Sequence, residues 1–226
     1  MDRLIRPDIF NGYVNAFFTD KSLGVDIDKI SKILPIKKED IFLPVQKHTD
    51  KVLVIDSVLN PDVADAVITR RKGILIGVQV ADCVPILLFD KKKSVAGAVH
   101  AGWRGTAAQI IKKTIKLMIE DFNSAPEDIL IAMGPSIRGN CYTVDDDVRD
   151  AVCRVTGNGE YYIRRSDGKY SIDLSSANMI QAISMGIPEK NIWRSKDCTY
   201  CNPNKYYSYR YSKAYNGSQG GFIGIL

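Results

Sequence analysis

Apolar and less apolar residues alternate through the middle of the chain, and this pattern predicts its central strands. Between Ile74 and Val80 every second position is apolar, which is the period of a β-strand with one buried face. A continuous apolar run follows at Ile86–Phe89, with the length of a buried strand. Pro85 precedes that run and lacks the N–H that a strand ladder uses, so we expect a kink or a strand end there.

A second strand is expected to pair with this apolar run. Residues 95–100 alternate again, and the charged segment 90–94 between the two stretches has the composition of a turn. An antiparallel return brings His100, at the end of the second strand, back towards Cys83, which lies just before the first. Thr106 follows shortly afterwards and is expected to cap a helix.

Helical spacing of apolar residues occurs in four places. In residues 110–119 the apolar positions form one face and three lysines form another, which is typical of a helix packed on a core. We expect further helices at 27–34 and 145–152, and one that starts from Asp173 as its cap and runs to Met185.

Short apolar stretches predict the remaining strands, and together with the helices they define the fold class. The expected strands are 41–45, 52–55, 65–69, 129–133, 161–163, 170–172, 192–194, 206–209 and 222–225. The sequence therefore predicts an α+β fold with mixed, mostly antiparallel strands and helices packed outside them. With 226 residues and no linker or internal repeat, we expect a single domain over residues 1–226.

Composition and charge exclude several classes of protein. The chain is 45% apolar and 25% charged, which is ordinary for a globular protein. No apolar run approaches the ~20 residues of a membrane span, and no secretory core is apparent, so we expect a cytoplasmic protein with no membrane partner. A net charge of +5 without a basic helix or nucleic-acid motif predicts no nucleic-acid partner. The five cysteines are expected to be reduced thiols.

The candidate chemistry lies in the few histidines and in one cysteine. The only histidines are His48 and His100, and Cys83 lies 35 residues after the first and 17 before the second. Two imidazoles and one thiolate suit zinc and leave a fourth tetrahedral position for water. The spacing alone favours the plainer alternative of two core or capping histidines and a buried free cysteine. The Cys198–Cys201 pair lacks a second pair that would complete a zinc site, so we interpret it as structural.

Several motifs resemble one known family. The sequence Ala81–Pro85 followed by His100–Thr106 closely resembles the polyphenol-oxidase, or laccase-domain, family, also called the YfiH family. Gln46–His48 is similar to its earlier element and Cys141–Val144 to its central one. Cys198–Thr199 and Tyr207–Arg210 resemble its C-terminal element. The family's Gly-Arg after that element is Gly217–Ser218 here, so one positive contact is missing.

The resemblance implies a fold, a cofactor and an activity. It implies a layered α/β/β/α sandwich, a zinc ion, and purine nucleoside chemistry rather than multicopper oxidation. The implied reactions are phosphorolysis of adenosine, inosine, guanosine and methylthioadenosine and hydrolytic deamination of adenosine, with nucleoside and phosphate as small-molecule partners. A laccase cluster needs many imidazoles, and the chain has two histidines. A zinc-activated water would attack C6 of adenine.

The same resemblance and the residue chemistry assign candidate roles. The expected zinc ligands are His48, Cys83 and His100. The expected catalytic residues are Asp82, Cys83 and His100, with Asp82 either the general base or a partner that orients a ligand histidine. The expected substrate-binding residues, with the two arginines placed on phosphate, are Gln46, Arg104, Tyr209 and Arg210.

Two other classes of function remain open from the sequence. Cys83 could be the nucleophile of a hydrolase with a histidine as its base. Alternatively, the protein could be a non-catalytic module that only binds metal. Metal content separates the zinc enzyme from the hydrolase, and product detection separates both from the binding module.

Overall fold

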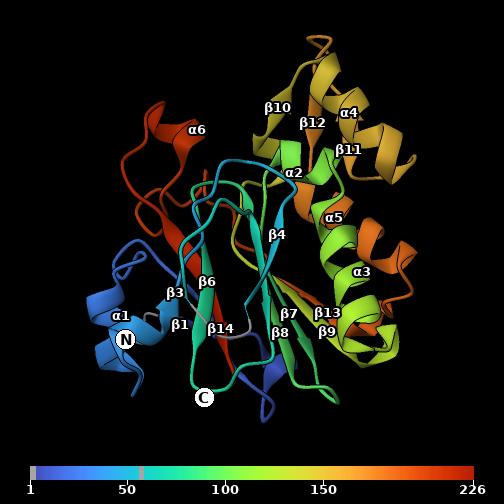
Figure 1. Ribbon diagram of the computed structural model, residues 1–226. Helices are drawn as coiled ribbons and strands as arrows, with labels where there is room; N and C mark the ends of the chain where they lie inside the picture. The colour runs from blue at the N-terminus through green and yellow to red at the C-terminus, as the bar shows by residue number, and fades with distance from the viewer. Residues whose placement is uncertain (1–3, 56–58) are drawn as a thin grey trace.

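Two β-sheets face each other at the centre of the molecule. The computed structural model describes residues 4–55 and 59–226, so residues 1–3 and 56–58 lie outside it. One sheet has the strand order β1-β2-β14-β6-β3, formed by Leu4–Ile5, Asn15–Thr19, Gln219–Gly224, Leu75–Val80 and Ile41–Phe42. The other has the order β13-β9-β7-β8-β5-β4, formed by Ile192–Arg194, Ile129–Met133, Val84–Asp90, Val95–Ala101, Ala66–Thr69 and Val52–Ile55. Figure 1 shows the two sheets side by side.

Both sheets are mixed and mostly antiparallel, as predicted. The parallel pairs are β3 with β6, β13 with β9, and β4 with β5, and the other neighbours in these two sheets run antiparallel. The predicted hairpin forms with β7 and β8 as its strands, and Pro85 pairs with His100 in its register. Cys83, one position before β7, therefore lies across from the end of β8.

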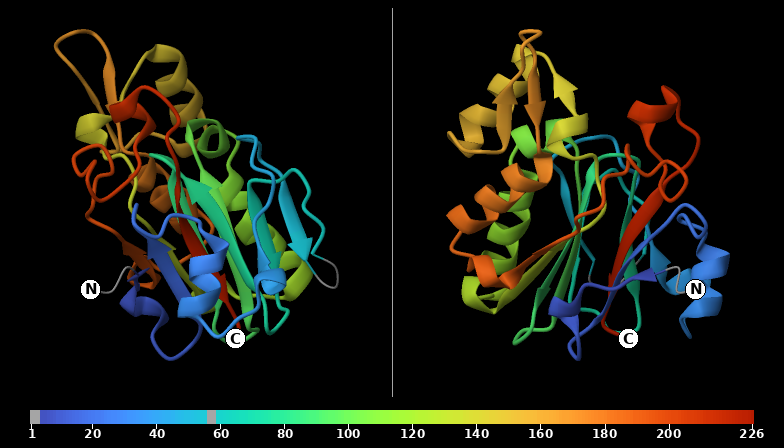
Figure 2. Two further views of the ribbon diagram at one scale, coloured as in Figure 1. Left: turned by 90° about the vertical axis from the view of Figure 1, so that its left-hand side faces the viewer. Right: turned by 180° about the vertical axis from the view of Figure 1, so that it is seen from behind.

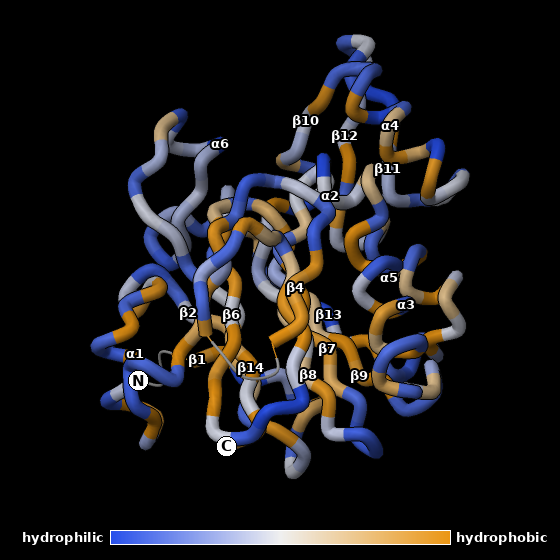
Figure 3. The backbone as a smooth tube through the Cα atoms, viewed as in Figure 1, coloured by the Kyte–Doolittle hydropathy of each residue, from blue (hydrophilic) through white to orange (hydrophobic). Residues whose placement is uncertain are grey.

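Three apolar clusters hold the layers together. One fills the space between the sheets, where Phe18 and Ile76 of the first sheet meet Leu87 and Ala132 of the second. Figure 3 shows the strands of both sheets as the most hydrophobic part of the chain. Phe18 sets the close approach, since a Cβ on Gly134 would lie 2.4 Å from its ring. Residues of the described core are buried almost completely, so the sandwich provides a rigid frame for its edges.

Helices cover the outer faces of both sheets. On the six-stranded sheet lie α3 (Ile110–Phe122) and α5 (Leu174–Ser184), and on the five-stranded sheet lies α1 (Ile27–Ile33). The views in Figure 2 show the resulting α/β/β/α layers, which confirm the predicted architecture. No helix of residues 4–55 and 59–226 is long and apolar enough to cross a membrane.

Smaller elements rise above one end of the sandwich. The small sheet has the order β10-β12-β11, formed by Thr143–Val144, Tyr170–Ile172 and Tyr162–Arg164, and β11 and β12 form an antiparallel hairpin. Around it lie α2 (Trp103–Ala107) and α4 (Asp146–Thr156), while α6 (Tyr209–Ser212) lies on a separate C-terminal loop. These elements frame the edge at which β6, β7 and β8 meet.

The strand end expected at Pro85 falls one residue earlier, because β7 begins at Val84 and the carbonyl of Pro85 already accepts the backbone N–H of Gly134 at 2.9 Å. Two local predictions are wrong, and each has a physical reason. Thr106 lies inside α2 and does not cap α3, which starts from Gln109. Residues 206–209 form no strand, since Ser208 caps α6 by accepting the backbone N–H of Tyr211.

Candidate functional site

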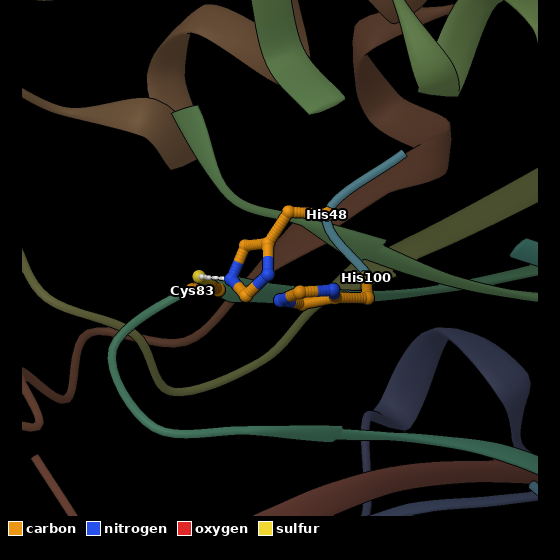
Figure 4. Close-up of side chains that lie close together, drawn as sticks. All are labelled: His48, Cys83 and His100. Carbon is orange, nitrogen blue, oxygen red and sulfur yellow. Dashed lines mark hydrogen bonds between the residues drawn. The ribbon is translucent and has the colours of Figure 1, made fainter. Parts of the chain in front are cut away.

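His48, Cys83 and His100 meet at one end of the sandwich. His48 lies in the loop between β3 and β4, Cys83 in the β6–β7 connection and His100 near the end of β8. The three potential ligand atoms all lie within 4.8 Å of one another. Cys83 Sγ lies 4.0 Å from His48 Nε2, and the two imidazole rings meet edge to face with 4.7 Å between their centroids. Figure 4 shows the three side chains pointing towards a common point.

A buried carboxylate, Asp65, positions both histidines. Its Oδ1 lies 2.8 Å from His100 Nδ1 and accepts the backbone N–H of His48 at 3.0 Å. Its Oδ2 accepts the backbone N–H of Thr49 at 2.6 Å and that of Lys47 at 3.2 Å. These bonds hold His48 at φ 57°, in the left-handed region. Because Asp65 engages Nδ1 of His100, the Nε2 atom is left for a ligand.

The charges within this group reinforce one another. Burial by itself would raise the pKa of the Cys83 thiol, but the positive charge of His100 and hydrogen bonds from both imidazoles lower it to about 6. Burial opposes the charged form of His100, yet the Cys83 thiolate and the Asp65 carboxylate raise its pKa to about 9. Burial also opposes the charge on Asp65, but the bonds from His100 and Thr49 hold its pKa well below the usual range. Without metal, Cys83 and His100 therefore form a thiolate–imidazolium pair at neutral pH.

The donor set and its surroundings fit a zinc ion. Zinc takes neutral imidazole nitrogens and thiolate sulfur in tetrahedral sites. The lowered pKa of Cys83 makes its thiolate available at neutral pH. Space is kept clear beside the donors, since a Cβ on Gly102 would lie 2.9 Å from Cys83 Sγ and 3.2 Å from His48 Cδ2. A residue larger than glycine at position 102 would intrude on the ligands.

A pocket of about 770 Å³ opens over His48, Cys83 and His100. That volume falls within the range of small-molecule sites. Every candidate site residue expected from the sequence contributes to its wall. The lining residues are Gln46, His48, Gln79, Val80, Ala81, Asp82, Cys83, His100, Trp103, Arg104, Ile137, Tyr142, Leu174, Tyr209, Arg210, Tyr215 and Ser218.

Two arginines and two tyrosines give the pocket its charge and its aromatic surfaces. The Arg104 guanidinium lies 4.3 Å from the ring centroid of Trp103, and the side chain is exposed. Arg210 donates to the carbonyl of Thr143 at 3.1 Å and lies 5.2 Å from the centre of the Tyr142 ring. Burial raises the pKa of Tyr142 to about 12, so its phenol stays neutral and can donate a hydrogen bond. Tyr209 is 58% exposed at the mouth.

The carboxylate of Asp82 is engaged by the C-terminal segment. Its Oδ1 accepts the hydroxyl of Thr199 at 2.6 Å, and its Oδ2 accepts the backbone N–H of Arg210 at 2.7 Å. The residue is 8% exposed and has φ 84°, in the left-handed region that Asp tolerates. Asp82 therefore ties the strand end that carries Cys83 to the loop that carries Arg210. It makes no recorded hydrogen bond to either histidine.

The amide of Gln46 is also committed to the protein. Its Nε2 donates to the carbonyl of Gln79 at 2.8 Å, and its Oε1 accepts the backbone N–H of Gln79 at 2.8 Å. The Gln46 side chain thus makes the same pair of hydrogen bonds to β6 that a neighbouring strand would make. This pair fixes the start of the loop that carries His48. Its remaining surface lines the pocket.

Sequence reasoning missed three residues of this site. The sequence places Asp65 only in a strand, although a carboxylate at the edge of an apolar strand requires a buried partner. The sequence motifs contain Tyr142 and Thr199 but indicate no role for either residue. The signal for all three lies in long-range contacts, such as the 117-residue separation of Asp82 and Thr199.

A protein-family model matches most of the chain that forms this sandwich and its His-Cys-His site. The model described as multi-copper polyphenol oxidoreductase laccase matches residues 21–226, and the chain belongs to this family. Despite the family's description, two histidines cannot build a multicopper cluster.

Similar proteins include curated enzymes and a solved structure. A purine nucleoside phosphorylase from Aquifex aeolicus is 40% identical over 85% of this chain and 89% of its own length. The adenosine deaminase RL5, from an unknown prokaryotic organism, is 36% identical over 83% of this chain and 72% of its own. The crystal structure of YlmD from Geobacillus stearothermophilus superposes with a TM-score of 0.92 at 26% identity, covering 99% of this chain and 96% of that one. The chain is therefore an enzyme, which disfavours the non-catalytic module.

Proposed function

We propose that this chain is a zinc-dependent purine nucleoside enzyme with two activities. In phosphorolysis, phosphate displaces the base from adenosine, inosine, guanosine or methylthioadenosine and yields a free purine and a pentose 1-phosphate. In deamination, water replaces the amino group of adenosine and yields inosine and ammonia. The relatives named purine nucleoside phosphorylase and adenosine deaminase support these two reactions.

One observation carries the proposal: the three donors and both arginines border the same pocket. A metal site alone fits many functions, and two exposed arginines alone fit any anion. Together, in a pocket of about 770 Å³, they offer a cation site next to groups that bind phosphate. A nucleoside and a phosphate ion are of a size for such a volume.

His48, Cys83 and His100 would hold the zinc ion. When bound, zinc acts as a Lewis acid and lowers the pKa of water towards ~7. The Asp65 carboxylate accepts the Nδ1 proton of His100. The lone pair of Nε2 is therefore free to bind zinc. The same carboxylate fixes the His48 loop, so the protein holds both imidazoles in place before the metal arrives.

The other pocket residues would bind and orient the substrates. Arg104 and Arg210 offer planar guanidinium groups that match phosphate oxygens in pairs. With serine at position 218, where the family has arginine, phosphate binding depends on these two. Tyr209 would stack on the purine at the mouth of the pocket, and the neutral Tyr142 phenol would donate a hydrogen bond to substrate.

For Asp82 the hydrogen bonds support a positioning role over that of general base. Both of its oxygens accept bonds from the segment that carries Arg210. Each carboxylate oxygen keeps a second lone pair, so a proton can still be accepted, but the side chain is not free to turn. Gln46 is likewise a positioning residue, because both ends of its amide pair with Gln79.

A cysteine-nucleophile hydrolase is the second candidate. It is favoured by the lowered pKa of Cys83, about 6, and by the 4.0 Å separation of its sulfur from His48 Nε2. In that alternative the thiolate attacks the substrate directly and zinc would block the reaction. The two candidates therefore predict opposite effects of metal on activity.

The test combines metal analysis with product detection. Wild-type protein loaded with zinc is incubated with each nucleoside, with and without phosphate, and products are separated by chromatography. Metal content is measured by mass spectrometry for the wild type, Cys83→Ser and His100→Ala. A zinc enzyme loses metal and both activities together in the two variants, and added zinc partly restores them. Cys153→Ser, a thiol of α4, serves as the unaffected control.

Three results would overturn the proposal. A fully active wild type from which chelation has removed all metal would support the hydrolase, as would a Cys83→Ser protein that holds as much zinc as the wild type but makes no product. A zinc-loaded wild type that leaves every nucleoside unchanged, with phosphate present, would exclude both reactions.

A further inference from the structure

A second group of metal-binding side chains lies in the loops beside the pocket. It consists of Cys141, at the end of a 3₁₀ turn (Gly139–Cys141), and of Cys198 and Cys201. The sequence showed only the Cys198–Cys201 pair, which lacked a partner. The fold supplies a third sulfur from 57 residues earlier in the chain, because Ser136 bridges to Cys198 and aligns the two segments.

The three sulfurs lie close enough together to share a cation. Their Sγ atoms are all within 4.8 Å of one another, and those of Cys141 and Cys201 are 3.2 Å apart. All three are free thiols. Sulfurs that share a tetrahedral zinc lie roughly 3.8 Å apart, from a Zn–S distance of about 2.3 Å.

The surrounding backbone is arranged as it is around a bound thiolate. Cys198 is 8% exposed, and its sulfur accepts the backbone N–H of Arg138 at 3.4 Å. Its carbonyl accepts the side-chain amide of Asn202 at 2.9 Å, which closes the turn around the Cys-x-x-Cys segment. The N–H of Thr199 donates to the carbonyl of Ser136 at 3.1 Å. Hydrogen bonds to a sulfur and a closed turn favour a fixed, ionised ligand.

We infer that Cys141, Cys198 and Cys201 bind a second zinc ion, separate from the one proposed at His48, Cys83 and His100. Three thiolates are soft donors that select zinc over magnesium or calcium. Cys201 is exposed, so water can take the fourth position on the solvent side. The inference does not depend on what the first site does.

The second zinc would fix one wall of the pocket. Cys141 precedes Tyr142, which lines the pocket, and Cys198 precedes Thr199, which donates to Asp82. A cation held by Cys141 and the Cys198–Cys201 turn therefore clamps the segment of Tyr142 to the segment that leads to Arg210. Its role is to position these groups, since none of the three sulfurs belongs to the pocket wall.

The test is a count of zinc in variants that empty one site at a time. Full-length protein is purified without chelator, supplied with excess zinc and desalted, and zinc per chain is measured by mass spectrometry. We expect about two equivalents in the wild type and in Cys153→Ser. We expect about one in Cys83→Ser, where the second site remains, and about one in Cys201→Ser, where the first remains.

Alkylation of the wild type provides a measurement that needs no variant. Zinc should slow the modification of Cys141, Cys198 and Cys201 together, and chelation should restore it, as followed peptide by peptide in a mass spectrometer. Circular dichroism of Cys201→Ser checks that the variant is folded. One equivalent in wild type that is lost in Cys201→Ser but kept in Cys83→Ser would support this site and count against the first.

Three outcomes would overturn the inference. The first is a Cys83→Ser protein that holds no zinc. The second is a Cys201→Ser protein that holds as much as the wild type. The third is a zinc-treated wild type in which Cys141 and Cys201 resist alkylation until a reductant is added, which would show a disulfide instead of a metal site.

Discussion

Asp65 contacts His100 through a 2.8 Å bond between its Oδ1 atom and Nδ1 of the imidazole, and both side chains are buried. The same oxygen accepts the backbone N–H of His48. One carboxylate thus fixes the His100 ring through a bond to its side chain and the His48 loop through a bond to its backbone. Two histidines that are 52 residues apart in the chain therefore depend on a residue that does not line the pocket.

Replacement of Asp65 should therefore weaken metal binding without removing a ligand. Asp65→Asn keeps the shape of the side chain but loses its charge, so His100 is no longer held with its Nδ1 proton towards position 65. We expect zinc affinity at the first site to fall about 10- to 100-fold. Competition titration against a chromophoric chelator measures the change, in a Cys201→Ser background that removes the proposed second site.

A matched control is Asp90→Asn. Asp90 is equally buried and accepts two backbone N–H groups, from Lys92 and Lys93, but it lies at the other end of β7. This variant should be less stable to heat with unchanged zinc affinity. Equal loss of affinity in both variants would show that Asp65 acts through general stability alone.

The space beside the ligands gives a second prediction. In Gly102→Ala the new Cβ would lie 2.9 Å from Cys83 Sγ, so the sulfur or the His48 ring must move. Overpacking costs about 1–3 kcal/mol, which is roughly 5- to 150-fold in zinc affinity. Gly97→Ala in β8 is the control, because its Cβ would meet Leu88 of the neighbouring strand β7 at an ordinary 3.5 Å. Unchanged zinc affinity in Gly102→Ala would show that the ligands do not need this space.

The layered fold was predictable because its signals are local and repeated. Alternation at 74–80 and 95–100 predicted β6 and β8, and the apolar face at 110–119 predicted α3. The strand expected at 206–209 does not form. Tyrosines favour strands in general, but here Ser208 caps a helical turn. Strand propensity is weak against a specific side-chain-to-backbone bond.

The site was predictable in part for a related reason. Ligand-type residues are rare in this chain, and the hairpin register carries His100 back to Cys83. The roles of Asp65 and Cys141 could not be predicted from the sequence, because each acts through a contact made only when distant segments pack together. The sequence alone places Gln46 and Asp82 at the pocket. Only the fold shows that Gln46 is hydrogen-bonded to Gln79, and Asp82 to Thr199 and the Arg210 backbone.

The charges of the metal-free site predict a pH profile for Cys83. Its thiol pKa is lowered from an ordinary value of about 8.5 to about 6, while His100 stays positive until its own pKa of about 9. Because only the thiolate reacts with iodoacetamide, the alkylation rate should rise as pH increases through about 6 and be level by neutral pH. Peptide mass spectrometry on chelator-treated protein isolates this thiol.

Removal of the positive partner should shift that profile. In His100→Ala the midpoint of the alkylation curve should move upward towards the ordinary thiol range, since burial then acts with less opposition. Zinc should abolish the reaction in the wild type at every pH at which it is bound. A midpoint near that of a free cysteine in the wild type would show that the imidazolium does not stabilise the thiolate.

Arg210 offers a way to separate the two proposed reactions. Its guanidinium lies above Tyr142 in the pocket, and phosphate takes part only in phosphorolysis. In Arg210→Ala the backbone N–H that donates to Asp82 remains, so the loop keeps its anchor. Loss of a charged hydrogen-bond donor costs about 1.5–3 kcal/mol, which is roughly 10- to 150-fold in KM for phosphate. Steady-state rates with varied phosphate should show that increase, while adenosine deamination in phosphate-free buffer stays within about twofold of the wild type.

Arg154→Ala, on the exposed face of α4, should change neither rate. Equal losses of both activities in Arg210→Ala would mean that the arginine serves the nucleoside or the fold instead of phosphate.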